Sequence, residues 1–179
     1  VGAIAGGYAG KGVGELIDPT TEDAWLRENF SSRPYVQKGE TIDTYRPAYT
    51  YGGYAEDQHA GKRFSDIEGD LKAGWEKTEH GAKMAWDRAK GAVKDAFDYR
   101  SAHRYGTDAH ERHAARPYEE IESDLSEGWE TTRDASGRTW DEARYAVKDA
   151  YDRKCRLRDE NLKIDRSVTD NPGRKDVAP

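Results

Sequence analysis

The sequence predicts an all-α protein, and three observations carry this prediction. A block of 54 residues occurs twice, and the apolar residues of both copies recur at helical rather than alternating spacing. Glycines at a strict four-residue spacing precede the two copies. We therefore expect a glycine-zipper segment at the N-terminus, two tandem helical hairpins after it, and extended connectors and an extended tail around them.

The residues that usually fill a protein core are scarce in this chain. Its 179 residues include only seven Val, six Ile, six Leu and three Phe, and 36% of all residues are charged. Such a composition approaches that of disordered chains. Five Trp and eleven Tyr point the other way, because aromatic side chains bury more area each than aliphatic ones. We expect a thin core built from Trp, Tyr and Ala.

The internal repeat defines the organisation of the chain. Residues 45–98 align with residues 99–152 at a constant offset of 54 without a gap, and 25 of the 54 positions are identical. Each copy opens with a tyrosine-rich box, from Tyr45 to Gly52 in the first and from Tyr99 to Gly106 in the second. Identity at this level indicates a duplication, with helical repeat 1 over 45–98 and helical repeat 2 over 99–152.

Each copy carries two helical patterns. Five residues of each copy, ten in all, are the predicted anchors of the core. In the first pattern the anchors are four positions apart, and in the second an alanine stands between the tryptophan and the valine, which gives a spacing of three and then four. The anchors are Ile67, Leu71, Trp75, Trp86 and Val93 in the first copy, and Ile121, Leu125, Trp129, Trp140 and Val147 in the second. We expect each copy to fold as a helical hairpin with its two tryptophans facing each other. Helices this short are marginal alone, so stacking of the copies or association between chains must complete the core.

Residues 1–19 are predicted to be a self-association segment. Gly2, Gly6, Gly10 and Gly14 would form one ridge of a helix with almost no side chain, which allows two backbones to touch. Each glycine costs a lone helix about 1 kcal/mol relative to Ala. Four glycines in register therefore favour a packed helix over an isolated one.

The remaining segments connect or follow these units. Residues 20–44 are expected to form a short helix through Trp25 and Leu26 to about Phe30, followed by an extended connector. Residues 153–179 form a charged tail whose sizeable apolar residues before Val168 are Leu157, Leu162 and Ile164. We expect extended or mobile chain there.

No motif predicts an enzyme, a cofactor or a small-molecule substrate. His110 and His113 stand three apart and invite a metal interpretation, but the first copy has Glu56 in place of His110, and a solvated or helix-end histidine is the favoured interpretation. The glycines of the first segment lack the strand and the Lys-Ser or Lys-Thr end of a phosphate loop. No catalytic, cofactor-binding or metal-ligating residue is therefore assigned.

Charge and length exclude further classes of partner. The net charge of -6 disfavours nucleic acid, because phosphate neutralisation needs a basic surface. A single cysteine, Cys155, excludes an internal disulfide framework. No run of 18 apolar residues occurs in the chain, but a membrane segment upstream of Val1 is left open, since the chain opens on Val within a glycine pattern.

The chain resembles uncharacterised bacterial glycine-zipper proteins, which are often grouped with general stress proteins. The resemblance rests on the glycines running into Ile17-Asp18-Pro19-Thr20, on the stretch from Glu22 to Tyr35, on the Tyr-Arg-Pro-Ala-Tyr box and on the Trp-Asp-Arg-Ala-Lys helix, and it covers residues 1 to about 152. It implies a non-enzymatic bacterial accessory protein, and it carries no active-site residues to this chain. The Trp-containing module, often single in that family, is doubled here.

Two functions remain after these exclusions. The favoured one is a self-associating structural or stress-protective protein that forms homo-oligomers, as a closed ring or an open filament. The alternative is a membrane-associated or envelope-associated protein whose glycine ridge continues an upstream membrane hairpin. The sequence leaves the compartment open and slightly favours the cytoplasm over the envelope or the extracellular space.

Overall fold

The chain is all-α. The computed structural model describes residues 22–113, 116–132 and 138–169, and it has no strand within these ranges. This confirms the predicted fold class. The elements are α1 (Glu22–Asn29), a 3₁₀ helix (Phe30–Ser32), α2 (Ile42–Gln58), α3 (Phe64–Trp75), α4 (Trp86–Arg112), α5 (Tyr118–Thr132) and α6 (Trp140–Thr169).

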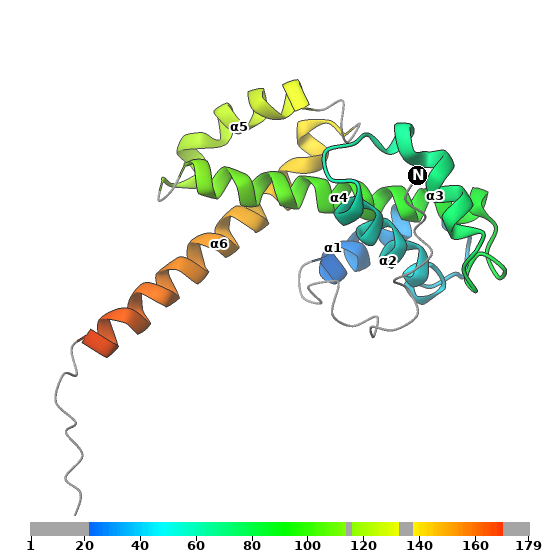
Figure 1. Ribbon diagram of the computed structural model, residues 1–179, viewed down its shortest axis with the longest axis horizontal. Helices are drawn as coiled ribbons and strands as arrows, with labels where there is room; N and C mark the ends of the chain where they lie inside the picture. Colours follow the sequence, from blue (N-terminus) through cyan, green and yellow to red (C-terminus); the bar gives the residue numbers. More distant parts are fainter. Residues whose placement is uncertain (1–21, 114–115, 133–137, 170–179) are drawn as a thin grey trace, which may run out of the picture.

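Three long helices, α2, α4 and α6, form the body of the fold (Figure 1). Helix α2 packs on the first part of α4, and the last part of α4 packs on the first part of α6. Residue numbers rise together across the first pair, from Tyr45 beside Arg88 to Glu56 beside Arg104, so the two helices run parallel. The short helices α3 and α5 make the return connections. Each long helix thus contacts its neighbour in the series, as in a repeat protein.

Glycine permits the closest approach between the long helices. A Cβ atom on Gly52 would overlap the backbone carbonyl of Val93, and a Cβ atom on Gly106 would overlap that of Val147. The two pairs are related by the repeat offset of 54 residues. The repeat therefore encodes one helix crossing, used twice.

Hydrogen bonds of the aromatic core also repeat at this offset. The Tyr51 hydroxyl donates to the Leu71 carbonyl at 2.9 Å, and the Tyr105 hydroxyl donates to the Leu125 carbonyl at 3.0 Å. The indole nitrogens do the same: Trp75 donates to the Met84 carbonyl at 2.8 Å, and Trp129 donates to the Arg138 carbonyl at 3.0 Å. Aromatic side chains thus satisfy their polar atoms while filling the core.

The hairpin arrangement differs from the expectation in two respects. Helix α4 runs without a break across residues 98 and 99, so one helix belongs to both repeats. The Trp75 ring packs edge-on against Tyr51 of α2, with ring centres 5.4 Å apart, so its aromatic partner comes from outside the predicted hairpin. The tyrosine-rich opening boxes are helical and supply the partners that the short helices lack.

Two segments expected to be extended contain helix. The connector predicted to extend to residue 44 ends earlier, because α2 begins at Ile42. The tail prediction was wrong for residues 153–169, which continue α6. Arg, Lys, Leu and Glu favour helix there, and no Gly or Pro interrupts the chain between Trp140 and Pro172. Residues 170–179 lie outside the described ranges.

The second half of α6 lacks the small residues on which a further long helix could pack closely. Where the repeats place small residues at the helix crossing, this half carries charged ones. Ala48, Gly52 and Ala55 of the first repeat, and Ala102, Gly106 and Ala109 of the second, correspond to Arg156, Glu160 and Lys163. Long charged side chains at these positions would prevent a crossing as close as those at Gly52 and Gly106.

Candidate functional site: the uncovered face of the second repeat

An N-terminal arm, residues 22–40, covers one face of the first repeat. The Tyr35 ring lies over Gly91 of α4, in space that a side chain at that position would fill. The Tyr35 hydroxyl donates to the Asp95 carboxylate at 2.6 Å, and Arg33 pairs with the same carboxylate at 3.0 Å. The Tyr49 hydroxyl lies 2.8 Å from that of Tyr35, whose proton is already committed, so Tyr49 donates.

The arm is held by a cluster of cations and rings. The Trp25 ring packs on Tyr99 with ring centres 4.9 Å apart, and the guanidinium groups of Arg33 and Arg138 lie 4.9 and 5.3 Å from the Trp25 ring. Arg138 also pairs with Asp95 at 3.0 Å and with Asp98 at 3.3 Å. Because Arg138 precedes α6, this cluster joins the arm to both repeats.

Burial dominates the electrostatics of this cluster. Burial, followed by the charge of Asp95, raises the pKa of Tyr35 far above its ordinary value, and burial raises the pKa of Tyr49 to about 12. Both hydroxyls therefore stay protonated and act as donors at neutral pH. Burial also raises the pKa of Asp98, although Lys94 and Arg138 oppose this change. The cluster can hold the arm, and its geometry suits a structural clamp.

Among the residues that the structure describes, no arm covers the equivalent face of the second repeat. Tyr145 replaces Gly91, and its side chain is 53% exposed. Asp149 corresponds to Asp95 of the first repeat, and its Oδ2 atom is buried without a hydrogen-bond partner among the described residues. Around them lies a hollow of about 390 Å³ between α5 and α6, lined by Tyr118, Glu122, Arg144, Tyr145, Lys148, Asp149 and Asp152. We call this surface the uncovered face.

His103 does not replace the missing arm as a cationic partner of Asp149. Burial lowers the pKa of His103, and the charge of Asp149 only partly opposes this change. The imidazole is therefore neutral at neutral pH. An exposed tyrosine ring beside a carboxylate is suited to binding another protein surface, as the arm binds the face around Asp95 in the first repeat.

The residues predicted from the sequence fall into two groups. Gly2, Gly6, Gly10 and Gly14 lie outside the described residues. The ten core anchors are all placed: nine are buried, and Trp140 is half-buried against the core. Neither group includes Tyr145 or Asp149. The signal that could have found them is the alignment of the two copies, which sets Tyr145 opposite Gly91.

Two negative findings apply to the described part of the chain. His110 lies in the last turn of α4 and His113 follows that helix, and no group of three or more His, Cys, Asp or Glu residues in the described ranges could hold a metal ion. None of the described helices combines the length and the apolar character needed to cross a bilayer.

Comparison with known proteins finds no matching family model, no similar curated protein and no similar solved structure. The resemblance to glycine-zipper proteins therefore stays a prediction from the sequence.

Proposed function

We propose that this chain is a non-enzymatic structural protein that binds further copies of itself, forms an open filament and serves in stress protection. The observation that carries the proposal is the uncovered face of the second repeat. The same face of the first repeat is occupied by the arm, which gives Asp95 two donors and covers Gly91 with an aromatic ring. A neighbouring copy would do the same for Asp149 and Tyr145.

Two features favour a second copy as the occupant. The described residues comprise two similar repeats but one arm, so among them one face remains for a contact between chains. The uncovered face would meet a different surface of its neighbour, and such head-to-tail contacts produce open polymers or rings. The glycine spacing of residues 2–14 supplies a candidate for the opposing surface, since a helix with that ridge can approach closely.

Replacing Tyr145 by Glu should disperse the assembly, because a carboxylate would then face Asp149 and the exposed ring would be lost. Sedimentation velocity would show a shift from oligomer to monomer. Tyr145→Phe is the matched control and should assemble like the parent, since it keeps the ring. A folded Tyr145→Glu variant with the mass of the parent would remove this face from the proposal, and a monomeric parent would contradict self-association as a whole.

The glycine ridge is tested independently by the double variant Gly6→Leu, Gly10→Leu. Leucine favours helix more than glycine does, so circular dichroism should show unchanged or higher helicity. The bulky side chains should nevertheless disperse the oligomer, because two backbones could no longer touch. Light scattering would report the mass. Full assembly of the double variant would mean that these glycines are a flexible leader rather than a contact surface.

A further inference from the structure

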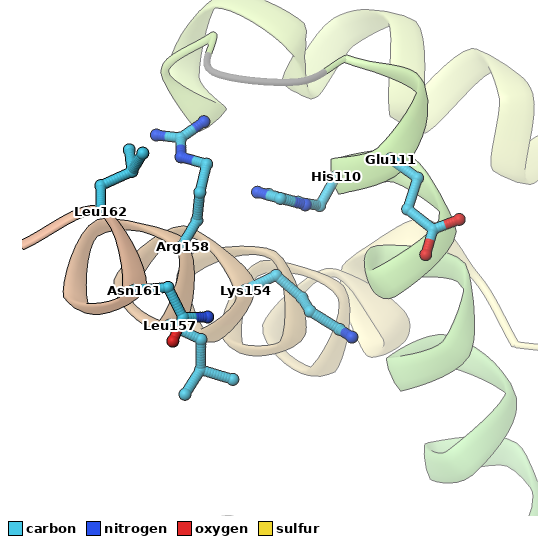
Figure 2. A pocket seen from close by; sticks show the side chains of 7 residues that line it. All are labelled: His110, Glu111, Lys154, Leu157, Arg158, Asn161 and Leu162. Atoms are coloured by element: carbon cyan, nitrogen blue, oxygen red, sulfur yellow. The ribbon is translucent and has the colours of Figure 1, made fainter. Parts of the chain in front are cut away.

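A groove opens where α4 ends and α6 continues alone (Figure 2). Its volume is about 750 Å³. Figure 2 shows the His110 ring reaching from α4 and the Arg158 side chain rising from α6 on the same side of the groove, with Leu162 next to Arg158. Lys154, Leu157 and Asn161 of α6 complete the lining together with Glu111 of α4.

The first repeat shows how the equivalent position is filled. There the end of α2 meets α4 through two ion pairs, Glu56 with Arg104 at 2.7 Å and Asp57 with Arg100 at 2.8 Å. Glu56 is only 1% exposed, so its carboxylate is part of the interior. A buried carboxylate needs such a cation, because an unpaired charge in the interior is costly. In the first repeat, the two cations and two carboxylates are balanced.

The second repeat keeps the cations and loses one carboxylate. Arg100 and Arg104 correspond to Lys154 and Arg158, and Asp57 corresponds to Glu111, but His110 stands in place of Glu56. The Nε2 atom of His110 is buried and has no hydrogen-bond partner among the described residues. In the second repeat an imidazole therefore takes the place of the Glu56 carboxylate next to Arg158, and the facing helix contributes no carboxylate at that position.

Asp159 does not take over this position. It pairs with Arg158 at 3.2 Å from the adjacent residue of the same helix, and its side chain is 58% exposed. An ion pair between partly exposed neighbours of one helix contributes little to stability. The Glu56 carboxylate, in contrast, comes from the facing helix and lies inside the contact.

We propose that this groove binds a short-chain monocarboxylate, an organic anion with one carboxylate and a small apolar tail. The carboxylate takes the place of the Glu56 side chain, accepts hydrogen bonds from His110 and Arg158, and neutralises the cation left without a carboxylate from the facing helix. The tail lies against Leu162, which is 50% exposed. The site is separate from the uncovered face, because Tyr145 and Lys154 are nine residues apart and so point to opposite sides of α6.

Titration of the full chain with hexanoate, followed by calorimetry and by the histidine signals in NMR spectra, tests the proposal. The parent should bind one hexanoate and shift the His110 signal. His110→Glu places the residue of the first repeat in the second, so its own carboxylate should fill the site and weaken binding about tenfold or more. Arg158→Gln should weaken binding to a similar degree.

Control variants and ligands separate this site from unspecific effects. Arg156→Gln removes an exposed charge from another side of α6 and should bind hexanoate like the parent. Leu162→Ser should bind hexanoate more weakly but acetate equally, since acetate lacks the tail. Hexanoate should also raise the unfolding temperature of the parent and leave that of His110→Glu unchanged.

Two results would overturn the proposal. Hexanol or inorganic phosphate binding as tightly as hexanoate would show that the groove selects either apolar surface or charge alone. Unchanged hexanoate binding in both His110→Glu and Arg158→Gln, each folded by circular dichroism, would place the ligand elsewhere. Self-association of the same variants, measured by sedimentation, should match the parent, so failure here is distinguishable from failure of the uncovered face.

Discussion

Trp75→Ala should lower the free energy of unfolding by about 3 to 5 kcal/mol, the cost typical of removing a buried aromatic side chain. Trp75 is 1% exposed, and its ring packs edge-on against Tyr51. Its indole nitrogen donates to the Met84 carbonyl at 2.8 Å, so the variant also leaves that acceptor without its donor. Urea unfolding followed by circular dichroism would measure the loss.

The repeat provides a second instance of the same prediction. Trp129 is 3% exposed, packs on Tyr105 with ring centres 5.2 Å apart and donates to the Arg138 carbonyl. Trp129→Ala should therefore cost a similar amount. Leu157→Ala is the control, because a side chain that is 46% exposed contributes little, and its effect should stay within about 0.5 kcal/mol. A Trp75→Ala variant as stable as the parent would contradict the aromatic core.

Gly52→Ala should destabilise the fold by about 2 kcal/mol, although alanine is the better helix former. The added methyl group would overlap the Val93 carbonyl, which belongs to a backbone that cannot turn aside as a side chain can. The two helices must then separate along their contact. Gly106→Ala should have the same effect at the second crossing, where the overlap is with Val147.

Gly69→Ala is the matched control for this prediction. Gly69 lies within α3, and a Cβ atom there would meet nothing within 4 Å. The same substitution should therefore stabilise the protein by about 1 kcal/mol through helix propensity alone. A lower unfolding temperature for Gly52→Ala and a higher one for Gly69→Ala would establish that close packing of the helices, rather than backbone freedom, requires glycine at position 52. Stabilisation at both positions would show that α2 and α4 are not in such close contact.

The helical class, the duplication and the anchor positions could be predicted from the sequence because they depend on local spacing. Apolar residues three and four apart mark one face of a helix wherever it lies, so Ile67, Leu71 and Trp75 were identified before their partners were known. The 54-residue offset likewise predicts that each contact of one copy recurs in the other. The paired hydrogen bonds of Trp75 and Trp129 follow from it.

The spacing of apolar residues does not predict the full extent of the long helices, including α4 and α6. Helix α2, which contains the opening box of the first copy, has no simple apolar stripe, since its buried residues include Thr50, Gly52, Gly53 and Glu56 as well as tyrosines. Such a mixture does not resemble an amphipathic helix until the neighbouring helix is in place. The charged half of α6 resembles a solvated tail in composition, although no Gly or Pro interrupts it before Pro172.

The sequence by itself determined that this protein is helical, that its core is aromatic and that one unit is used twice, because these properties follow from residue type and spacing along the chain. Only the tertiary structure decided that the arm covers the first repeat and that, within the described ranges, the face around Tyr145 stays exposed. It also decided that Glu56, which corresponds to His110, is buried and paired with Arg104. Both depend on contacts between residues far apart in the chain, and spacing along one helix carries no information about what lies across from it.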